Sequence, residues 1–185
     1  GKPLPGLNIE IWDEDNKPLP QGKVGQIAVS GPTVMEGYLT EDGPVDAGLY
    51  KTEDGTKWVL TGDLAYIDED GYLWFMGRSK RLVIISGYNV YPGDIEKLLT
   101  ELDFIKESCA VQGFDAEGKK LIRLYVVADG ADENAEEYNL QIIELCSARL
   151  DKFSVPRDIR YIDALPRTRL EKVDFMSLTE NEPTK

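Results

Sequence analysis

Short alternations of apolar and polar residues predict β-strands in the N-terminal part of the chain. Residues 7–11 alternate in this way before a turn-forming run at 13–18, as in a half-buried strand that enters a hairpin. Residues 25–30 predict the next strand. Two later apolar runs flank residues 68–71, where Gly71 can adopt the positive φ of a tight hairpin turn. This part of the chain is therefore predicted to be predominantly β.

A helical period replaces the alternation after Pro92, a residue that suits the first turn of a helix. The apolar positions that follow are spaced i, i+3, i+4 and i+7, and they are Ile95, Leu98, Leu99 and Leu102. Strands are predicted next at residues 109–114 and 121–127. The second part of the chain therefore alternates helix and strand.

A second helix is predicted after the acidic stretch 129–137, with Ile143, Cys146 and Leu150 on its buried face. A last strand is predicted at residues 159–162. The predicted fold class is α+β: a β-rich subdomain, part of a distorted barrel, is followed by a small α+β C-terminal domain with a short sheet flanked by helices.

The change of pattern places the domain boundary between residues 1–78 and residues 79–185. The charge distribution supports this division, because the first part holds 6 basic and 14 acidic side chains and the second holds 15 and 20. We expect the first part to be the last β subdomain of a larger domain and the second part to be a domain of its own.

Composition narrows the functional classes. The 185 residues are 42% hydrophobic and 30% charged, as in globular proteins, and no apolar run is long enough for a transmembrane segment. The net charge of −13 argues against nucleic acid as a partner. Histidine is absent, which excludes Ser-His-Asp and Cys-His catalysis and any histidine metal site within this chain. The two cysteines, Cys109 and Cys146, form no CxxC pair and are interpreted as reduced core thiols, which suits a cytoplasmic protein.

Basic residues gather near the C-terminus of this acidic chain. Seven cations face four carboxylates in the window 149–172, and they are Arg149, Lys152, Arg157, Arg160, Arg167, Arg169 and Lys172. Such an island could bind a phosphate group, and it could equally be solvated surface charge.

Three segments carry residues suited to ligand chemistry. Residues 58–63 predict a strand that ends in a Thr-Gly-Asp turn, where a carboxylate can grip a vicinal diol such as that of ribose. Residues 77–92 place three cations before a strand, a Ser-Gly-Tyr-Asn connection and a helix, and Gly87 would let a ligand approach the backbone. Residues 165–172 predict a proline-led loop that ends on Lys172. Each segment alone also fits an ordinary turn, linker or surface loop.

In their order and spacing, these segments resemble the C-terminal third of the adenylate-forming superfamily, which includes acyl-CoA synthetases, nonribosomal peptide adenylation domains and firefly-type luciferases. The resemblance covers nearly all of the chain. The segment Ser86–Pro92 is more similar to fatty or aryl acyl-CoA synthetases than to peptide adenylation domains. Further segments that resemble this superfamily are Gly1–Gly6, Gly25–Val29, Gly31-Pro32, Gly37-Tyr38 and Phe153–Pro156.

The resemblance implies a two-step reaction, in which a carboxylate attacks the α-phosphate of ATP to give acyl-AMP and the thiol of CoA then displaces AMP. It implies that Asp63 holds the ribose hydroxyls, that Arg78 assists at the nucleotide and that Lys80 is the hinge of the mobile C-terminal domain. Lys172 would be the catalytic lysine that stabilises charge around the α-phosphate. The path of CoA would be lined by Ser86, Gly87 and Tyr88.

This sequence departs from the family pattern in three places. Lys80 stands where the family more often has Asp, and Glu171 stands where it usually has Gly. The usual Trp-Gly-Glu is replaced by residues 115–119. The resemblance also assigns the phosphate loop, the adenine-stacking aromatic residue, the glutamate that binds Mg²⁺ and the acyl pocket to an N-terminal domain upstream of Gly1. We therefore expect ATP and AMP, Mg²⁺ with ligands outside this chain, and CoA as co-substrate.

Three interpretations remain open at this point. The leading one is the C-terminal part of an AMP-forming acyl-CoA synthetase, whose partners are the missing N-terminal domain, a small carboxylic acid and CoA. The second is an adenylating domain that loads a carrier protein. The third is a non-catalytic binding module that keeps the fold. Glu171 and the missing Trp-Gly-Glu favour this interpretation, and the retained Asp63, Arg78 and Lys172 oppose it.

Overall fold

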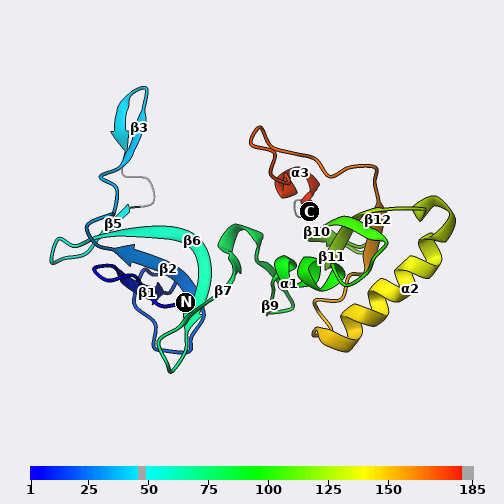
Figure 1. Ribbon diagram of the computed structural model, residues 1–185, viewed down its shortest axis with the longest axis horizontal. Coiled ribbons are helices and arrows are strands. Elements are labelled where there is room, and N and C mark those ends of the chain that lie inside the picture. Colours follow the sequence, from blue (N-terminus) through cyan, green and yellow to red (C-terminus); the bar gives the residue numbers. More distant parts are fainter. Residues whose placement is uncertain (46–48, 181–185) are drawn as a thin grey trace. The chain divides into compact units, whose positions relative to one another are not determined.

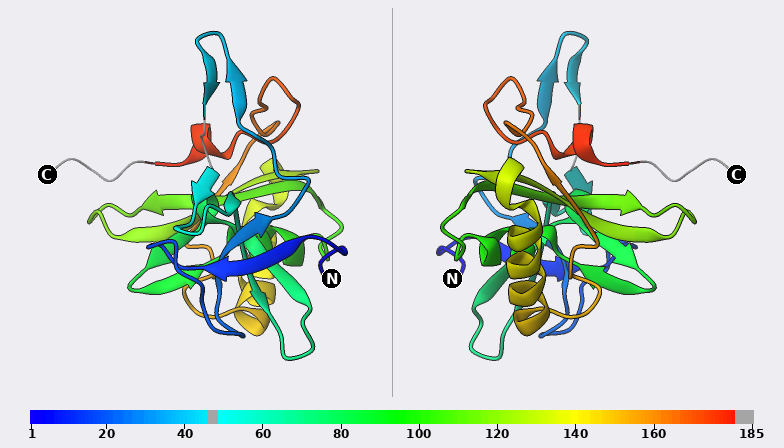
Figure 2. Two further views of the ribbon diagram at one scale, coloured as in Figure 1. Left: turned by 90° about the vertical axis from the view of Figure 1, so that its left-hand side faces the viewer. Right: turned by 90° about the vertical axis from the view of Figure 1, so that its right-hand side faces the viewer.

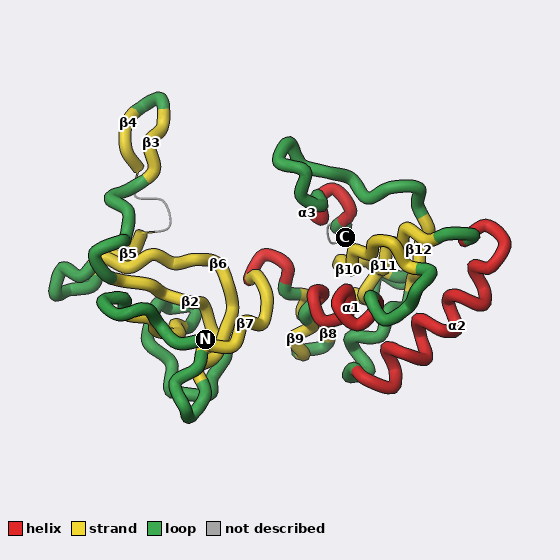
Figure 3. Tube along the Cα trace, in the orientation of Figure 1, coloured by secondary structure: helices red, strands yellow, loops and turns green. Residues whose placement is uncertain are grey.

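The computed structural model describes residues 1–45 and 49–180 (Figure 1). The chain forms two compact units, Gly1–Lys80 and Arg81–Lys185, and each unit has its own hydrophobic core. The α-helices all belong to the second unit in the described ranges (Figure 3). The mixed α+β class predicted from the sequence is confirmed.

The first unit is built on an antiparallel sheet in the order β1-β2-β6-β5, with β7 also paired to β6. These strands are β1 Asn8–Trp12, β2 Gly25–Ser30, β5 Leu49–Lys51, β6 Lys57–Ile67 and β7 Leu73–Arg78. A separate hairpin of β3 Tyr38–Thr40 and β4 Gly43–Val45 extends away from this sheet (Figure 2). Among the described residues the sheet is open, which agrees with the prediction of only part of a barrel.

Two small clusters on the two faces of this sheet hold the first unit together. Alternation along β1 explains why there are two, because Ile11 and Trp12 point to opposite faces. Ile11 packs with Ile27 and Ala65, whereas Trp12 packs with Ala28 and Trp58. The predicted strands and the hairpin turn at Gly71, which has φ +78°, are confirmed.

The second unit has a three-stranded sheet in the order β10-β11-β12, with β11 and β12 parallel. Its elements are β8 Val83–Ile85, β9 Tyr88–Val90, α1 Pro92–Leu99, β10 Ile105–Phe114, β11 Lys120–Ala128, α2 Ala131–Arg149, β12 Asp158–Tyr161 and α3 Phe175–Leu178. A 3₁₀ turn, η1 Ser79–Arg81, spans the boundary between the two units.

The sheet of the second unit is covered on both faces. Ala110 packs in the main core with residues of α1 and α2, such as Ile95 and Ile142. The neighbours of Ala110 on β10 alternate to the other face, where Cys109 and Val111 pack against the C-terminal segment. The helices therefore cover one face, and the segment that carries Lys172 is anchored on the other.

Several details of the predicted helices differ from the structure. The second helix, α2, begins at Ala131, inside the acidic stretch predicted to precede it, because Ala and Glu are good helix formers, and it ends before Leu150. The first helix ends at Leu99, so Leu102 packs against the core from the turn that follows. In α2, Ile142 and Cys146 are buried whereas Ile143 is 40% exposed. Both isoleucines fit helical spacing to Cys146, and packing against α1 and β12 selects the i, i+4 pair.

The two cysteines are free and buried, which confirms their interpretation as core thiols. Burial raises the pKa of Cys109 to about 12, and the nearby Glu96 carboxylate adds to this rise. Burial alone raises the pKa of Cys146 to about 11. Burial therefore favours the protonated form of both thiols, which is a weaker nucleophile than the thiolate.

Candidate functional site

In the first unit, Asp63 and Arg78 face each other across the β6–β7 ladder. Nε of Arg78 lies 3.0 Å from Oδ1 of Asp63, and the two side chains are 66% and 26% exposed respectively. Oδ1 of Asp63 is itself buried and lacks an aligned hydrogen-bond donor among the described residues. The pair presents a carboxylate and a guanidinium side by side, which suits the hydroxyl and phosphate groups of a nucleotide.

Asp63 lies within a bulge of β6. Gln26 of β2 pairs with Leu64, and Ala28 pairs with Leu60. The two partners are therefore two residues apart on β2 but four residues apart on β6. Gly62 supplies the positive φ of +74° inside this bulge. The predicted end of the strand at Thr-Gly-Asp is wrong, because the β2 and β7 ladders continue beyond the bulge and β6 extends to Ile67.

The predicted CoA-path residues form the turn between β8 and β9. Ser86 and Gly87 have φ +51° and +83°, as in the two-residue hairpin turn with two left-handed residues. The Tyr88 ring stacks on Phe153, with centroids 4.3 Å apart and an interplanar angle of 22°. No atom lies within 4 Å of a Cβ built on Gly87, so the backbone of this turn is open on that side.

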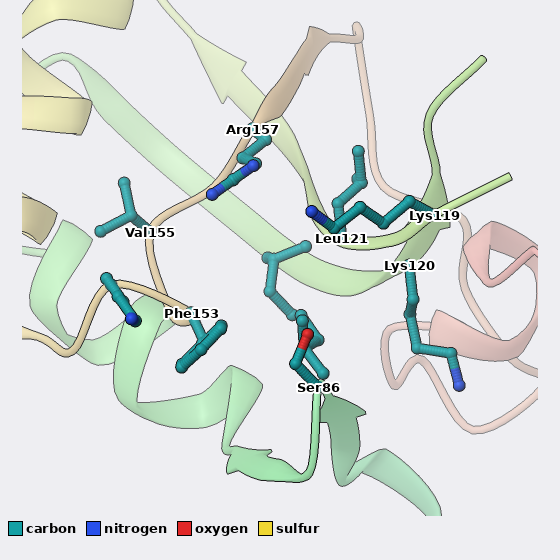
Figure 4. Close-up of a pocket in the computed structure, with 10 residues that line it drawn as sticks. Ser86, Lys119, Lys120, Leu121, Phe153, Val155 and Arg157 are labelled. Atoms are coloured by element: carbon teal, nitrogen blue, oxygen red, sulfur yellow. The ribbon is translucent and has the colours of Figure 1, made fainter. Parts of the chain in front are cut away.

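A basic pocket opens beside this turn (Figure 4). It is a cavity of about 40 Å³, enough for a small group such as a phosphate. Ile85, Ser86 and the β10–β11 hairpin form one side, and the segment after α2 forms the other. The polar and aromatic lining residues are Ser86, Lys119, Lys120, Lys152, Phe153 and Arg157. Four cations line this cavity in a chain of net charge −13, which makes it a candidate site for an anion.

Lys172 lies at the end of an exposed turn whose two flanks are anchored. Leu165 is buried before the turn, and Val173 and Phe175 pack in the same cluster after it. Arg167 forms an ion pair with Glu107 on β10 and donates from Nη1 to the carbonyl oxygen of Glu171 at 3.3 Å. The base of the turn is therefore fixed.

Within the described ranges, the Lys172 side chain is exposed and makes no ion pair. Its neighbour Glu171 does not bind it. A fixed backbone and an uncompensated ammonium are the properties required of a cation that stabilises charge developing on a ligand.

The turn at residues 168–172 has a backbone pattern that occurs four more times among the residues that the structure describes. Each of these turns has five residues. The N–H of the first residue donates to the carbonyl oxygen of the fifth, and the N–H of the fourth residue donates to the carbonyl oxygen of the first. The fourth residue has a left-handed backbone conformation. The five copies are residues 13–17, 52–56, 68–72, 115–119 and 168–172. The left-handed position holds Gly three times and Asn once, but Glu171 in the last copy, with φ +59°. Glycine adopts this left-handed conformation without the steric cost that a side chain such as that of Glu171 brings.

Lys80 is exposed and is the last residue of the first unit. Arg81, the first residue of the second unit, is held from three sides: it pairs with both carboxylate oxygens of Glu96 on α1, donates to the carbonyl oxygen of Ala110 at 3.4 Å and lies 5.1 Å above the Phe175 ring. The second unit is thus firmly packed from its first residue onward.

The structure groups Asp63 with Arg78 in the first unit and places Lys172 apart from residues 86–88 within the second. Sequence reasoning missed the pocket residues Lys119, Lys120 and Phe153. Two adjacent lysines in an acidic chain could have indicated a binding site. However, only the fold brings Lys119 and Lys120 close to the basic residues Lys152 and Arg157. The described residues contain no group of three or more His, Cys, Asp or Glu side chains that could hold a metal ion. No described helix is long and apolar enough to cross a membrane.

Comparison with known families fits this geometry. Residues 1–39 match the model of the AMP-binding enzyme family, and residues 94–172 match the model of the AMP-binding enzyme C-terminal domain. The second match ends on Lys172. The chain belongs to the AMP-binding enzymes, and its second unit contains their C-terminal domain.

Relatives agree with this assignment over most of the chain. Indoleacetate–CoA ligase of Aromatoleum aromaticum is 33% identical over 94% of this chain and 32% of its own length. Long-chain-fatty-acid–CoA ligase of Yersinia pestis is 31% identical over 98% of this chain and 31% of its own length. This chain spans about a third of the length of these curated relatives.

Solved structures show the same relationship. ATP-bound MatB of Rhodopseudomonas palustris has a TM-score of 0.75 and 34% identity, and the match covers 96% of this chain and 34% of MatB. The o-succinylbenzoate CoA synthetase MenE of Bacillus subtilis, in complex with its acyl-adenylate intermediate, has a TM-score of 0.80 and 28% identity over 100% of this chain and 36% of its own.

Proposed function

We propose that this chain is the C-terminal part of an AMP-forming acid–CoA ligase. In the first half-reaction a carboxylate oxygen attacks the α-phosphorus of ATP, so that acyl-AMP forms and pyrophosphate leaves. In the second, the CoA thiol loses its proton and attacks the acyl carbon, and AMP leaves. Residues 1–78 would complete the large adenylating domain, and residues 79–185 would be its mobile C-terminal domain.

Three side chains would serve the formation of acyl-AMP. Asp63 would accept hydrogen bonds from the ribose hydroxyls, and Arg78 beside it would face the nucleotide phosphates. Lys172 would stabilise the charge that develops on the α-phosphate oxygens. The phosphate loop, the Mg²⁺ ligand and the acyl pocket would come from the preceding domain, so the isolated 185 residues should fold but form no acyl-AMP.

The second unit would serve thioester formation after a rotation about Lys80. Residues Ser86 to Tyr88 would line the path of pantetheine, because the Gly87 backbone is open to a close approach. The basic pocket beside them would hold a phosphate group of CoA. This pocket is the main reason for proposing free CoA as the acyl acceptor. Free CoA includes a nucleotide with several phosphates, whereas the prosthetic group of a carrier protein has a single phosphate. The carrier-protein alternative is less supported.

Two finer assignments accompany this proposal. A role in fatty-acid metabolism is supported by relatives that act on long-chain fatty acids, whereas the relative that acts on indoleacetate supports an aryl acid. A cytoplasmic location is supported by the two unpaired thiols, since a reducing compartment keeps cysteines free.

Calorimetric titration of the 185-residue chain with CoA tests the acceptor assignment. CoA should bind with measurable heat, and pantetheine, which lacks the nucleotide phosphates, should bind at least about tenfold more weakly, a difference of about 1.4 kcal/mol. The double variant Lys119→Ala, Arg157→Ala should remove this preference. Lys106→Ala, a lysine paired with Asp129, is the matched control. Equal affinity of the chain for CoA and pantetheine would contradict the assignment.

A further inference from the structure

The first residue of the chain is already paired with the outer edge of β7. The Gly1 nitrogen donates to the carbonyl oxygen of Leu73 at 2.9 Å, and the Leu73 nitrogen donates to the carbonyl oxygen of Gly1 at 2.7 Å. Exchange of both bonds between the same two residues defines a hydrogen-bonded pair of an antiparallel ladder. Lys2 agrees with this register, because its ammonium lies 4.7 Å above the ring of Tyr72, the residue opposite.

The free edge of β7 continues beyond this pair. Leu73 directs its N–H and carbonyl toward Gly1 and therefore away from β6. Polar backbone groups alternate along a strand, so Phe75 must direct its N–H and carbonyl to the same outer edge. Within residues 1–45 and 49–180, no backbone hydrogen bond outside the β6–β7 ladder involves Phe75.

The side chains on this part of β7 are also unusually exposed. Trp74 is 53% exposed and Phe75 is 62% exposed. An edge with open backbone groups and exposed aromatic rings is a template for the addition of another strand. A bulge ends the template, since Phe75 pairs with Ala65 but Gly77 pairs with Leu64, which leaves Met76 as the extra residue.

We propose that the polypeptide immediately preceding Gly1 in the intact ligase adds to β7 as an antiparallel strand. The residue before Gly1 lies opposite Trp74, and the residue before that exchanges two hydrogen bonds with Phe75. This inference rests on the proposed function, because it takes the chain as the last third of a longer enzyme, as the lengths of its relatives indicate. The direction of Gly1 and Lys2 along β7 selects this occupant over a second copy of the chain.

A disulfide trap tests the register. The chain is extended by Thr-Val-Cys before Gly1 and carries Trp74→Cys, which creates a pair that is not hydrogen-bonded, with Cα atoms about 4.5 Å apart and within reach of a disulfide. Mild oxidation should give an intramolecular disulfide at least roughly tenfold faster than in the matched variant with Tyr72→Cys, because the second cysteine then lies two residues out of register. Equal rates, or disulfide-linked dimers, would overturn the proposal.

A second measurement leaves β7 unchanged, since Trp74→Cys also removes the hydrogen bond from Trp74 to Asp68. Extension of the chain by Thr-Val-Thr should slow hydrogen exchange of the Phe75 amide by about tenfold or more relative to the unextended chain. Extension by Thr-Pro-Thr should slow it less, because proline cannot donate to the Phe75 carbonyl and the pair then keeps only the bond from the Phe75 N–H. Unchanged exchange with Thr-Val-Thr would contradict the proposal. Neither readout needs catalysis, so failure of the ligase assignment would show separately, in the absence of acyl-AMP formation by the intact enzyme.

Discussion

Two turns of the second unit share one backbone pattern and differ in the residues that stabilise it. In residues 115–119, the Asp115 carboxylate accepts from the backbone N–H groups of Glu117 and Lys119 at 3.1 and 2.7 Å, and Gly118 takes the left-handed position. In residues 168–172, the Thr168 hydroxyl accepts one bond, at 3.3 Å, and Glu171 takes the left-handed position. Both turns end on a lysine.

The difference separates a turn stabilised by its own residues from one stabilised by its surroundings. The 115–119 turn has the residues that its geometry favours. The 168–172 turn lacks them and is held instead by the buried flanks and by Arg167. Strain at a left-handed residue that is not glycine commonly accompanies function. In the proposed ligase, Lys172 would serve acyl-AMP formation, whereas Lys119 would serve CoA binding.

The largest expected effect is that of Lys172→Ala on acyl-AMP formation in the intact ligase. Loss of a fixed cation at the transition state typically costs about 2.7 to 4 kcal/mol, or roughly 10² to 10³ in rate. Acid-dependent ATP–pyrophosphate exchange measures this step. Arg169→Ala is the control for a generic basic surface, and it should change the exchange rate less than about threefold. An exchange rate for Lys172→Ala within the same threefold range would remove the assignment.

Substitutions at the left-handed positions of the two turns, Gly118 and Glu171, should change the stability of the second unit in opposite directions. Gly118→Glu should lower the free energy of unfolding of the second unit by about 1 to 2 kcal/mol, because a side chain disfavours the left-handed conformation. Glu171→Gly should raise it by up to about 1 kcal/mol, since the gain is partly offset by the flexibility of glycine in the unfolded chain.

Urea unfolding can follow the two units separately. The helices, and hence the far-ultraviolet helix signal, belong to the second unit in the described ranges, whereas the three tryptophans Trp12, Trp58 and Trp74 belong to the first. Each substitution should shift the helix transition and leave the tryptophan transition unchanged. If Glu171→Gly destabilises the second unit, the turn is not strained at this position.

The smallest expected effect concerns the first residue of each turn. Asp115→Ala should destabilise the second unit by about 1 kcal/mol, because two backbone N–H groups lose a charged acceptor. Thr168→Ala removes one longer bond and should cost about half as much. The same urea titration measures both variants. Equal losses would show that the two turns are held equally by their first residues.

Much of the fold follows from local patterns. The alternation at residues 7–11, the glycine at position 71 and the apolar spacing after Pro92 each predicted an element that the structure contains. The exposed Ile143 was predicted to be buried because spacing alone could not choose between two adjacent isoleucines. The choice depends on the partner surface, which lies far away in the sequence.

The loop that carries Lys172 was predictable because one short segment forms it, and the role of Lys172 stays a prediction. The basic pocket was not predictable, because its lining comes from the β8–β9 turn, the β10–β11 hairpin and the segment after α2. No local pattern links Lys119 to Arg157. The sequence predicts a turn at Gly62, where the structure has a bulge, because a glycine with positive φ is common in both. The two are distinguished only by the pairing of β6 with its neighbouring strands before and after Gly62.

The most direct test of the account measures both half-reactions of the intact ligase for the two matched lysines. Lys172→Ala should reduce acyl-AMP formation by roughly 10² to 10³ and leave conversion of supplied acyl-AMP to acyl-CoA close to that of the parent. Lys119→Ala should leave acyl-AMP formation unchanged and raise the CoA concentration needed for half-maximal thioester formation by about tenfold. The account is contradicted if both substitutions impair the same half-reaction, or if neither impairs any.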